Sequence, residues 1–320
     1  MIFAVTNRVP QSAVELLRRA GEVRLDEREA AIPRADLLAL VVGVDAILAL
    51  LHDQVDAELL EAAGPQLRCV ANVAVGYDNV DLAAARERGV VVTNTPGVLD
   101  DATADLTMAL LLAATRRVAE GDRLVRSGRS WSWGMSFMLG SSLRGKRLGI
   151  IGLGGIGRRV AERARAFGME IAYHSRHPAP AEVEAALEAE RMPLEQLLRE
   201  ADVVSLHCPL TPETHHLIGA PELEAMKPGA VLVNAARGPV VDELALAEAL
   251  ASGQVAAAGL DVYEHEPQVE PGLLDLENVV LAPHLGSATV ETRTAMAELA
   301  ARNAISVARG EAPLTPVTSA

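Results

Sequence analysis

A glycine-rich turn in the middle of the chain constrains the fold most strongly. The run 152–157 reads GLGGIG, follows the apolar segment 147–151 and precedes a helical pattern over 158–167. In such a strand–turn–helix unit the first glycine permits the tight turn, the second lets the backbone approach a pyrophosphate, and the third lets helix and strand pack closely. The helix N-terminus then faces the anion. We therefore expect dinucleotide binding here, the alternative being a purely structural glycine turn.

The length and composition of the chain indicate two layered α/β domains. Chains longer than roughly 250–300 residues usually divide into domains, and this one has 320 residues. Half of the residues are hydrophobic but only 2% are aromatic, so small aliphatic side chains must fill the interior. We expect two doubly wound parallel sheets. One is a Rossmann-type cofactor domain with a dimerisation arm at 99–286, and the other is a smaller flavodoxin-like substrate domain formed by 1–98 and a C-terminal return at 287–320.

Charge and cysteine content exclude several functional classes. The formal net charge of −14 argues against binding to nucleic acid or to an anionic membrane surface. The only cysteines, Cys69 and Cys208, both lie in apolar surroundings, so we expect neither a disulfide framework nor a metal site. The sequence contains no leader-like segment and no apolar run of membrane-spanning length, so we expect a cytoplasmic protein.

Short apolar runs alternate with helical patterns on both sides of the glycine turn. Expected strands are 2–6, 46–50, 68–73, 90–94, 147–151, 170–174, 203–207, 230–234, 256–261 and 279–282, and expected helices are 11–20, 81–88, 103–117, 158–167 and 289–309. The helix at 103–117 is almost wholly apolar between Leu106 and Ala114, which predicts packing between domains or subunits. The segment 121–140 carries both tryptophans and reads as a loop or arm.

Three polar residues follow predicted strands of the second half, where ligands bind in open α/β sheets. They are Arg237, Glu266 and His284. If these residues converge, a carboxylate on one imidazole nitrogen favours the protonated ring, which can then donate a proton to a carbonyl oxygen. The planar fork of an arginine suits a carboxylate. Taken singly, each residue is more often a solvated or loop-stabilising side chain than a catalytic one.

The chain resembles the D-isomer-specific 2-hydroxyacid dehydrogenase family through motifs that span almost its whole length. These are VGYDNVD at 75–81, the glycine turn, NAARGPVVD at 234–242, GLDV at 259–262, EP at 266–267 and PHLGSAT at 283–289. The resemblance implies His284 as general acid/base, Glu266 as its partner and Arg237 as the anchor of the substrate. It further implies that the substrate site includes Val75, Gly76, Leu51, Arg237 and Trp133, with the carboxylate on the backbone amides of Val75 and Gly76.

Within that family the chain is most similar to the glyoxylate/hydroxypyruvate reductase branch, through the stretches 50–56, 101–106 and 130–133. The implied reaction is NAD(P)H-dependent reduction of a small 2-oxo acid. In that branch the tryptophan matching Trp133 reaches the partner's substrate pocket across a homodimer interface. The alternative is that Trp131 and Trp133 only anchor the arm.

The resemblance and the position of the glycine turn together predict the cofactor contacts. They are Thr103, Gly152, Gly154, Gly155, Ile156, Gly157, Ser175, Arg176, His177, Cys208, Pro209, Ala235, Ala236, Asp261 and Gly286. NAD-specific folds place an acidic residue about 20 residues beyond the glycines, but the segment 172–178 here has none. Ser175 and Arg176 suit a 2′-phosphate instead, unless Arg176 points to solvent. We therefore expect NADP(H) to be preferred, with NAD(H) possible.

Two other functions remain open at this point. Phosphoglycerate oxidation is disfavoured because no regulatory domain follows residue 310 and Ser175 stands where the NAD-type acid would be. A dinucleotide-sensing interaction protein, like the corepressors of the same family, would keep similar motifs. Turnover of glyoxylate would separate an enzyme from such a protein.

Overall fold

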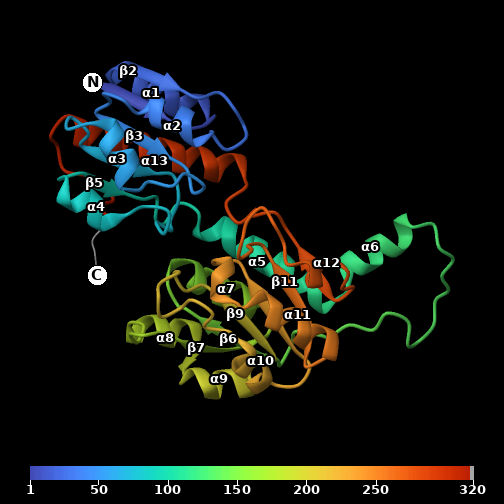
Figure 1. The fold of residues 1–320 in the computed structure, drawn as a ribbon. Helices are drawn as coiled ribbons and strands as arrows, with labels where there is room; N and C mark the ends of the chain where they lie inside the picture. The colour runs from blue at the N-terminus through green and yellow to red at the C-terminus, as the bar shows by residue number, and fades with distance from the viewer. Residues whose placement is uncertain (318–320) are drawn as a thin grey trace. The chain divides into compact units, whose positions relative to one another are not determined.

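The computed structural model describes residues 1–317 and contains two compact α/β units. One unit combines residues 1–99 with the segment that begins at Ala288, and the other spans Asp100–Ser287 (Figure 1). Each unit has one parallel sheet with helices on both faces. No helix of the described residues has both the length and the apolar character needed to cross a membrane.

The first unit has a five-stranded sheet in the order β2-β1-β3-β4-β5, which is the flavodoxin-like order. Its strands are β1 (Ile2–Val5), β2 (Glu22–Leu25), β3 (Ala46–Ala49), β4 (Cys69–Asn72) and β5 (Val91–Thr93), and its helices are α1 (Gln11–Ala20), α2 (Arg34–Leu40), α3 (Ala57–Ala63), α4 (Leu82–Glu87) and α13 (Val290–Ala308). Successive strand residues face opposite sides. Phe3 and Leu48 lie in the core cluster with α1 and α13, whereas Ala4 and Ile47 lie in the cluster with α2 and α3.

The second unit has a seven-stranded sheet in the order β12-β11-β10-β9-β6-β7-β8. Its strands are β6 (Arg147–Ile151), β7 (Glu170–His174), β8 (Ala189–Arg191), β9 (Val203–Leu206), β10 (Ala230–Asn234), β11 (Val255–Leu260) and β12 (Val279–Leu281). Its helices are α5 (Asp100–Thr115), α6 (Val118–Arg126), α7 (Gly155–Ala166), α8 (Ala181–Leu187), α9 (Leu194–Glu200), α10 (Ala220–Ala225), α11 (Glu243–Ser252) and α12 (Pro271–Leu274). Val203 faces the core with α5 and α7, and Val204 faces the core with α9 and α11.

The expectation of a loop over all of 121–140 was wrong for its first part. The helix α6 runs from Val118 to Arg126, after a left-handed turn at Arg117 with φ 55°. It is amphipathic, and the ion pair between Asp122 and Arg126 joins successive turns at 2.8 Å. The structure also has two short strands, β2 and β8, that the sequence analysis did not predict. Both lie at sheet edges, where a strand needs only one hydrogen-bonded neighbour and leaves a weak sequence signal.

Each sheet has one point where the strand order reverses. In the second unit it lies between β6 and β9, and in the first between β1 and β3. Loops that leave neighbouring strands in opposite directions open a crevice there, which is the usual ligand position in open α/β sheets. The glycine turn follows β6 and therefore borders the crevice of the second unit.

Candidate active site

Of the three glycines to which the motif assigns roles, close packing accounts for Gly152 and Gly157 and leaves space at Gly154. Gly152 has φ +98°, and a Cβ there would lie 2.7 Å from the backbone nitrogen of Cys208. A Cβ on Gly157 would lie 2.2 Å from the carbonyl oxygen of Gly152, so helix α7 could not pack against the turn. A Cβ on Gly154, by contrast, would meet no atom within 4 Å. The open side of Gly154 and the first amides of α7 fit a pyrophosphate.

The predicted cofactor residues line the carboxyl edge of the sheet in strand order. Asp261 follows β11, Ala235 and Ala236 follow β10, Cys208 and Pro209 lie beyond β9, Gly152–Gly157 follow β6, and Ser175, Arg176 and His177 follow β7. At about 4.8 Å per strand, this edge spans roughly 19 Å from β7 to β11. The length and the donor set fit an extended dinucleotide. At the β11 end, the Thr103 hydroxyl donates to the carbonyl oxygen of Gly286 at 3.1 Å, which brings these two predicted contacts together.

The end of β7 lies directly against the glycine turn. The Ser175 hydroxyl accepts a hydrogen bond from the Leu153 amide at 3.0 Å. Arg191, at the end of the edge strand β8, donates through Nη2 to the carbonyl oxygens of Ser175 at 3.1 Å and Arg176 at 3.2 Å. A second guanidinium therefore stands beside Arg176. Arg191 was not predicted as part of this site, because the short strand that carries it has a weak sequence signal.

His284 and Glu266 form a hydrogen-bonded pair. Nδ1 of His284 lies 2.8 Å from Oε2 of Glu266, and the two side chains are 24% and 31% exposed. The other carboxylate oxygen, Oε1, accepts from the Tyr263 amide at 3.1 Å. Burial alone would raise the pKa of Glu266, but the hydrogen bond to His284 and the positive charges of His284 and Arg237 outweigh it. The pKa therefore lies below its ordinary value, and Glu266 is a carboxylate at neutral pH.

The buried residue Asp261 fixes the loop that carries His284. The Asp261 carboxylate accepts from the amides of Leu285 at 2.6 Å and Gly286 at 2.8 Å, and its carbonyl oxygen accepts from the His284 amide at 2.8 Å. His284 itself adopts a left-handed backbone with φ 55°. Because a non-glycine residue is strained in this conformation, the bonds from Asp261 help to hold it. Burial raises the pKa of Asp261, whereas the two amide bonds favour its charged form.

A tight turn after β10 brings Arg237 to the same region. The Asn234 side chain donates to the Arg237 carbonyl oxygen at 2.9 Å and accepts from the Ala236 amide at 3.0 Å. A Cβ on Gly238 would lie only 1.9 Å from the Tyr263 carbonyl carbon. Only glycine lets this turn lie against the segment that leads to Glu266. The structure thus brings the guanidinium, the carboxylate and the imidazole together within the second unit.

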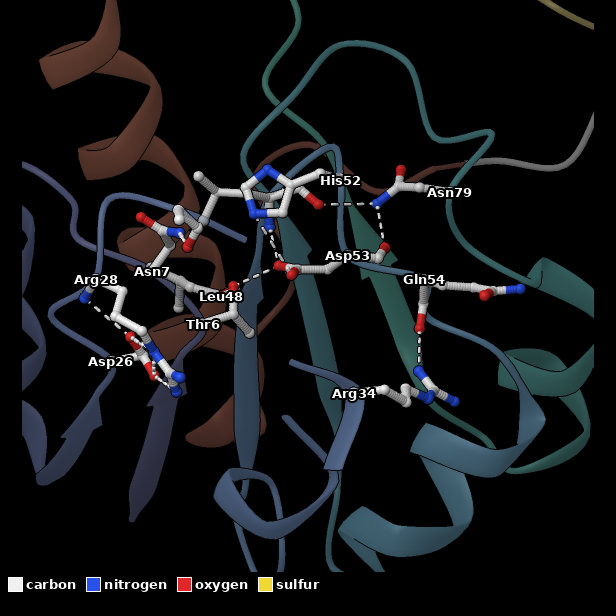
Figure 2. Close-up of polar contacts among 12 residues, drawn as sticks. Thr6, Asn7, Asp26, Arg28, Arg34, Leu48, His52, Asp53, Gln54 and Asn79 are labelled. Atoms are coloured by element: carbon white, nitrogen blue, oxygen red, sulfur yellow. Dashed lines mark hydrogen bonds and ion pairs between the residues drawn. The ribbon is translucent and has the colours of Figure 1, made fainter. Parts of the chain in front are cut away.

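The predicted substrate residues Val75, Gly76 and Leu51 belong to the first unit, in loops that follow β4 and β3. Buried Asp53 holds the loop after β3, since it accepts from the Thr6 hydroxyl and from the Leu50 amide (Figure 2). Asn79 donates to the carbonyl oxygens of Leu50 and Asp53, both at 3.1 Å. These contacts fix the turn that exposes Leu51. Asp53 and Asn79 were not predicted to stabilise this turn, although they lie in the sequence motifs 50–56 and 75–81.

Trp133 lies on the exposed arm that follows α6. It is 77% exposed, and Trp131 stacks on Phe137 with ring centroids 5.9 Å apart. Other apolar side chains of α6 and the arm are also exposed, namely Val118, Val125, Met135 and Leu139. Figure 1 shows α6 and the arm projecting from the sheet of the second unit. This concentration of exposed apolar side chains is typical of an interaction surface.

Potential metal ligands gather at one place in the described chain. The donor atoms of His215, His216 and Glu264 lie within 4.8 Å of one another. Nε2 of His216 also pairs with Oε1 of Glu264 at 2.7 Å. Cys69 and Cys208 are free thiols, and burial raises their pKa values to about 12 and about 11. Both are therefore neutral near pH 7.

Comparisons with known proteins agree with this geometry. The family model for the NAD-binding domain of D-isomer specific 2-hydroxyacid dehydrogenases matches residues 108–286. A glyoxylate reductase from Thermococcus litoralis is 51% identical over 314 residues, which cover 97% of this chain and 94% of that protein. A solved glyoxylate reductase from Paecilomyes thermophila superimposes with a TM-score of 0.90 at 38% identity, covering 99% of this chain and 98% of the other.

A third relative was solved with cofactor. It is an NADPH-dependent glyoxylate/hydroxypyruvate reductase from Sinorhizobium meliloti in complex with NADP and malonate. Its TM-score is 0.85 at 37% identity, and the alignment covers 99% of this chain and 96% of that one. The matches extend over both units and include the glycine turn and the loops of Arg237, Glu266 and His284. The chain belongs to the D-isomer specific 2-hydroxyacid dehydrogenase family.

Proposed function

We propose that this protein reduces a small 2-oxo acid, glyoxylate or hydroxypyruvate, to the corresponding 2-hydroxy acid, with NADPH preferred over NADH. The proposal rests mainly on the pairing of His284 with Glu266 near Arg237. These residues follow strands of the same sheet whose carboxyl edge carries the glycine turn. Relatives of about 50% identity over nearly the whole chain are glyoxylate reductases, which supports the substrate class.

Arg237, His284 and Glu266 have different roles in the reduction of a 2-oxo acid. The guanidinium of Arg237 can bind the substrate carboxylate through two parallel hydrogen bonds, which also fixes the orientation of the carbonyl group. Because Nδ1 of His284 faces Glu266, Nε2 is the nitrogen left to donate a proton to the carbonyl oxygen. The charge of Glu266 stabilises the protonated imidazole before that transfer.

The nicotinamide ring, when bound, supplies the hydride for the carbonyl carbon. The chain itself holds the cofactor through the strand-end loops described above, with Thr103 and Gly286 at the β11 end and Ser175 and Arg176 at the β7 end. Asp261 holds the His284 loop through backbone amides of the same unit.

The preference for NADPH rests on the charge around the end of β7. No acidic residue lies in 172–178, and Arg191 adds a second guanidinium next to Arg176. An acid at this position would accept from ribose hydroxyls but repel a 2′-phosphate. We expect kcat/KM with NADPH to exceed that with NADH by at least tenfold. Equal values, or a higher value with NADH, would show that Arg176 does not bind the phosphate.

The exposed arm supports a homodimer. We expect a second copy of this chain to cover the arm, because Trp131, Trp133 and the apolar face of α6 are otherwise exposed to water. In this arrangement Trp133 closes the partner's substrate pocket. Sedimentation velocity at assay concentrations measures the oligomeric state, and a fully active monomer would contradict the role of the arm.

A substrate panel tests the proposed activity. Glyoxylate, hydroxypyruvate, pyruvate and 3-phosphohydroxypyruvate are assayed with NADPH and NADH, and 3-phosphoglycerate with the oxidised cofactors. We expect the highest kcat/KM with glyoxylate or hydroxypyruvate. Faster oxidation of 3-phosphoglycerate would assign the protein to another activity of the family, and cofactor binding without turnover would indicate a sensing protein.

A further inference from the structure

A polar network in the first unit controls the direction of two backbone amides. The loop after β4 contains Ala74 and Val75, and the segment after β5 contains Asn94 and Thr95. The Thr95 amide donates to the Ala74 carbonyl oxygen at 2.9 Å, and the Asn94 side-chain amide donates to the Val75 carbonyl oxygen at 2.8 Å. Two successive carbonyl groups therefore point toward the segment after β5.

The geometry of the peptide bond then decides where the next amides point. In a trans peptide the C=O and the following N–H point in opposite directions, and both of these peptides are trans. The N–H groups of Val75 and Gly76 accordingly face away from Asn94. Within the described residues neither amide donates a hydrogen bond. Successive unpaired amides on one side of a loop form a concave anion site.

The Asn94 segment is itself held by the C-terminal return of the chain. The Asn94 amide donates to the Thr315 carbonyl oxygen at 3.3 Å, and the Thr315 hydroxyl donates to the Asn94 carbonyl oxygen at 2.6 Å. Fully buried Asn303, on α13, donates to that hydroxyl at 2.8 Å and accepts from the Thr315 amide at 3.1 Å. A further bond joins the Val317 amide to the Val92 carbonyl oxygen at 2.8 Å, next to an isolated antiparallel bridge between Thr93 and Pro316 at the edge of β5.

We propose that Asn94 is a positioning residue for the substrate carboxylate, and that Thr315 and Asn303 lock it in place. Asn94 does not touch the substrate. It holds the Val75 carbonyl so that the Gly76 amide is presented to the carboxylate, while the Thr95 amide does the same for Val75. Asn72 fixes the far end of the loop by donating to the Gly76 carbonyl oxygen at 2.9 Å. This inference rests on the proposed function, since it assumes a 2-oxo acid as ligand.

Replacement of Asn94 by aspartate is the most direct perturbation. Asn94→Asp keeps the shape of the side chain but removes the donor and sets a carboxylate against the Val75 carbonyl oxygen. A displacement of about 1 Å at a positioning group can cost on the order of 100-fold. We expect KM for glyoxylate to rise 10- to 100-fold and the Kd of oxalate, a non-reacting carboxylate probe, to rise in parallel. The Kd of NADPH should stay within twofold.

A second variant and a matched control keep the test decisive. Thr315→Val preserves the side-chain shape but cannot donate to Asn94, and we expect a smaller rise in KM with kcat within threefold of the parent. Asn278→Asp is the control, because the Asn278 side chain also donates to backbone carbonyl oxygens, at 3.3 and 3.0 Å, but in the second unit. It should leave KM for glyoxylate and the Kd of oxalate unchanged. If Asn94→Asp does not fold, Thr315→Val and Asn94→Ala carry the same comparison.

The outcomes separate this inference from the proposed function. A parent protein that turns over no 2-oxo acid contradicts the proposed function. A parent that reduces glyoxylate, together with folded Asn94 and Thr315 variants whose KM and oxalate Kd lie within twofold of the parent, overturns the positioning role alone. If the Asn94 variants also bind NADPH more weakly and melt at a lower temperature, to the same degree as KM rises, Asn94 has only a structural role. That result would also overturn the positioning role.

Discussion

Replacement of Glu266 by glutamine tests the coupling between this carboxylate and His284. Glutamine keeps the length of the side chain but carries no charge, so the imidazole loses the anion that stabilises its protonated form. Since the reduction requires a proton from His284, we expect the rate of Glu266→Gln to fall earlier as pH rises. The alkaline limb of the kcat/KM profile should move to lower pH.

The size of this displacement follows from the geometry of the pair. A hydrogen bond between charged groups contributes about 1.5–3 kcal/mol net. The Nδ1–Oε2 distance of 2.8 Å is favourable, but the two side chains are 24% and 31% exposed, so solvent screening places the value in the lower half of that range. At 1.36 kcal/mol per unit of pH, about 1.5–2 kcal/mol corresponds to roughly 1–1.5 units. On the alkaline limb itself, a displacement of this size lowers the rate at a given pH roughly 10- to 30-fold.

The assay measures kcat/KM for glyoxylate between pH 5 and 9 at saturating NADPH. Glu264→Gln is the matched control, because Glu264 also pairs with a histidine, His216, at 2.7 Å and lies two residues away. This control should keep the profile of the parent. A Glu266→Gln profile whose alkaline limb coincides with that of the parent would refute the coupling. So would the same displacement in Glu264→Gln.

The lowered pKa of Glu266 also predicts a change in stability with pH. A carboxyl group whose pKa is lower in the folded than in the unfolded state stabilises the fold above its ordinary pKa of 4.5. That contribution disappears as pH falls through the lowered value. The free energy of unfolding of the parent should therefore exceed that of Glu266→Gln most clearly at pH 6, and the difference should shrink below pH 4.5. Urea unfolding at both pH values measures it, and a difference that grows on acidification would contradict the sign.

Three further variants test the other roles. Arg237→Lys should raise KM for glyoxylate and lower kcat, because a lysine cannot form the bidentate contact; unchanged steady-state kinetics would make Arg237 structural. Trp133→Ala should lower kcat/KM for hydroxypyruvate while leaving the Kd of NADPH unchanged, and an unaffected rate in the dimer would assign the indole to anchoring only. The double variant Ser175→Asp/Arg176→Ala should prefer NADH over NADPH, and adding His284→Gln should lower its rate as much as in the parent. If the double variant still prefers NADPH, Arg191 rather than Arg176 binds the 2′-phosphate.

Much of the fold could be predicted from sequence because its elements carry strong local signals. The strands β7 and β10 and the helix α1 have the predicted bounds, since each is a compact apolar or amphipathic run with clear ends. The strands β2 and β8 were missed because edge strands of three or four residues bury little. The helix α6 was missed although it is amphipathic, because none of its residues is buried in a core and Gly121, a poor helix former, lies in its middle.

The candidate site divides in a similar way. Motif resemblance selected His284, Glu266 and Arg237, and the structure adds the distances that join the first two and the glycine that lets the Arg237 turn approach. The sequence does not reveal that Asn94 holds the loop after β4 or that Arg191 holds the end of β7. Their partners are backbone groups, and the relevant chain segments meet only in the folded sheet. Thr315 lies 221 positions from Asn94, which no local pattern could connect.

The most direct test of the central claim compares the parent with His284→Gln in single-turnover reduction of glyoxylate at saturating NADPH. We expect the parent to oxidise bound NADPH rapidly. The variant should bind NADPH with a similar Kd but react on the order of 10²–10⁴-fold more slowly, because glutamine cannot supply a titrating proton. A variant that reacts within threefold of the parent would remove His284 from the chemistry and contradict the proposed mechanism.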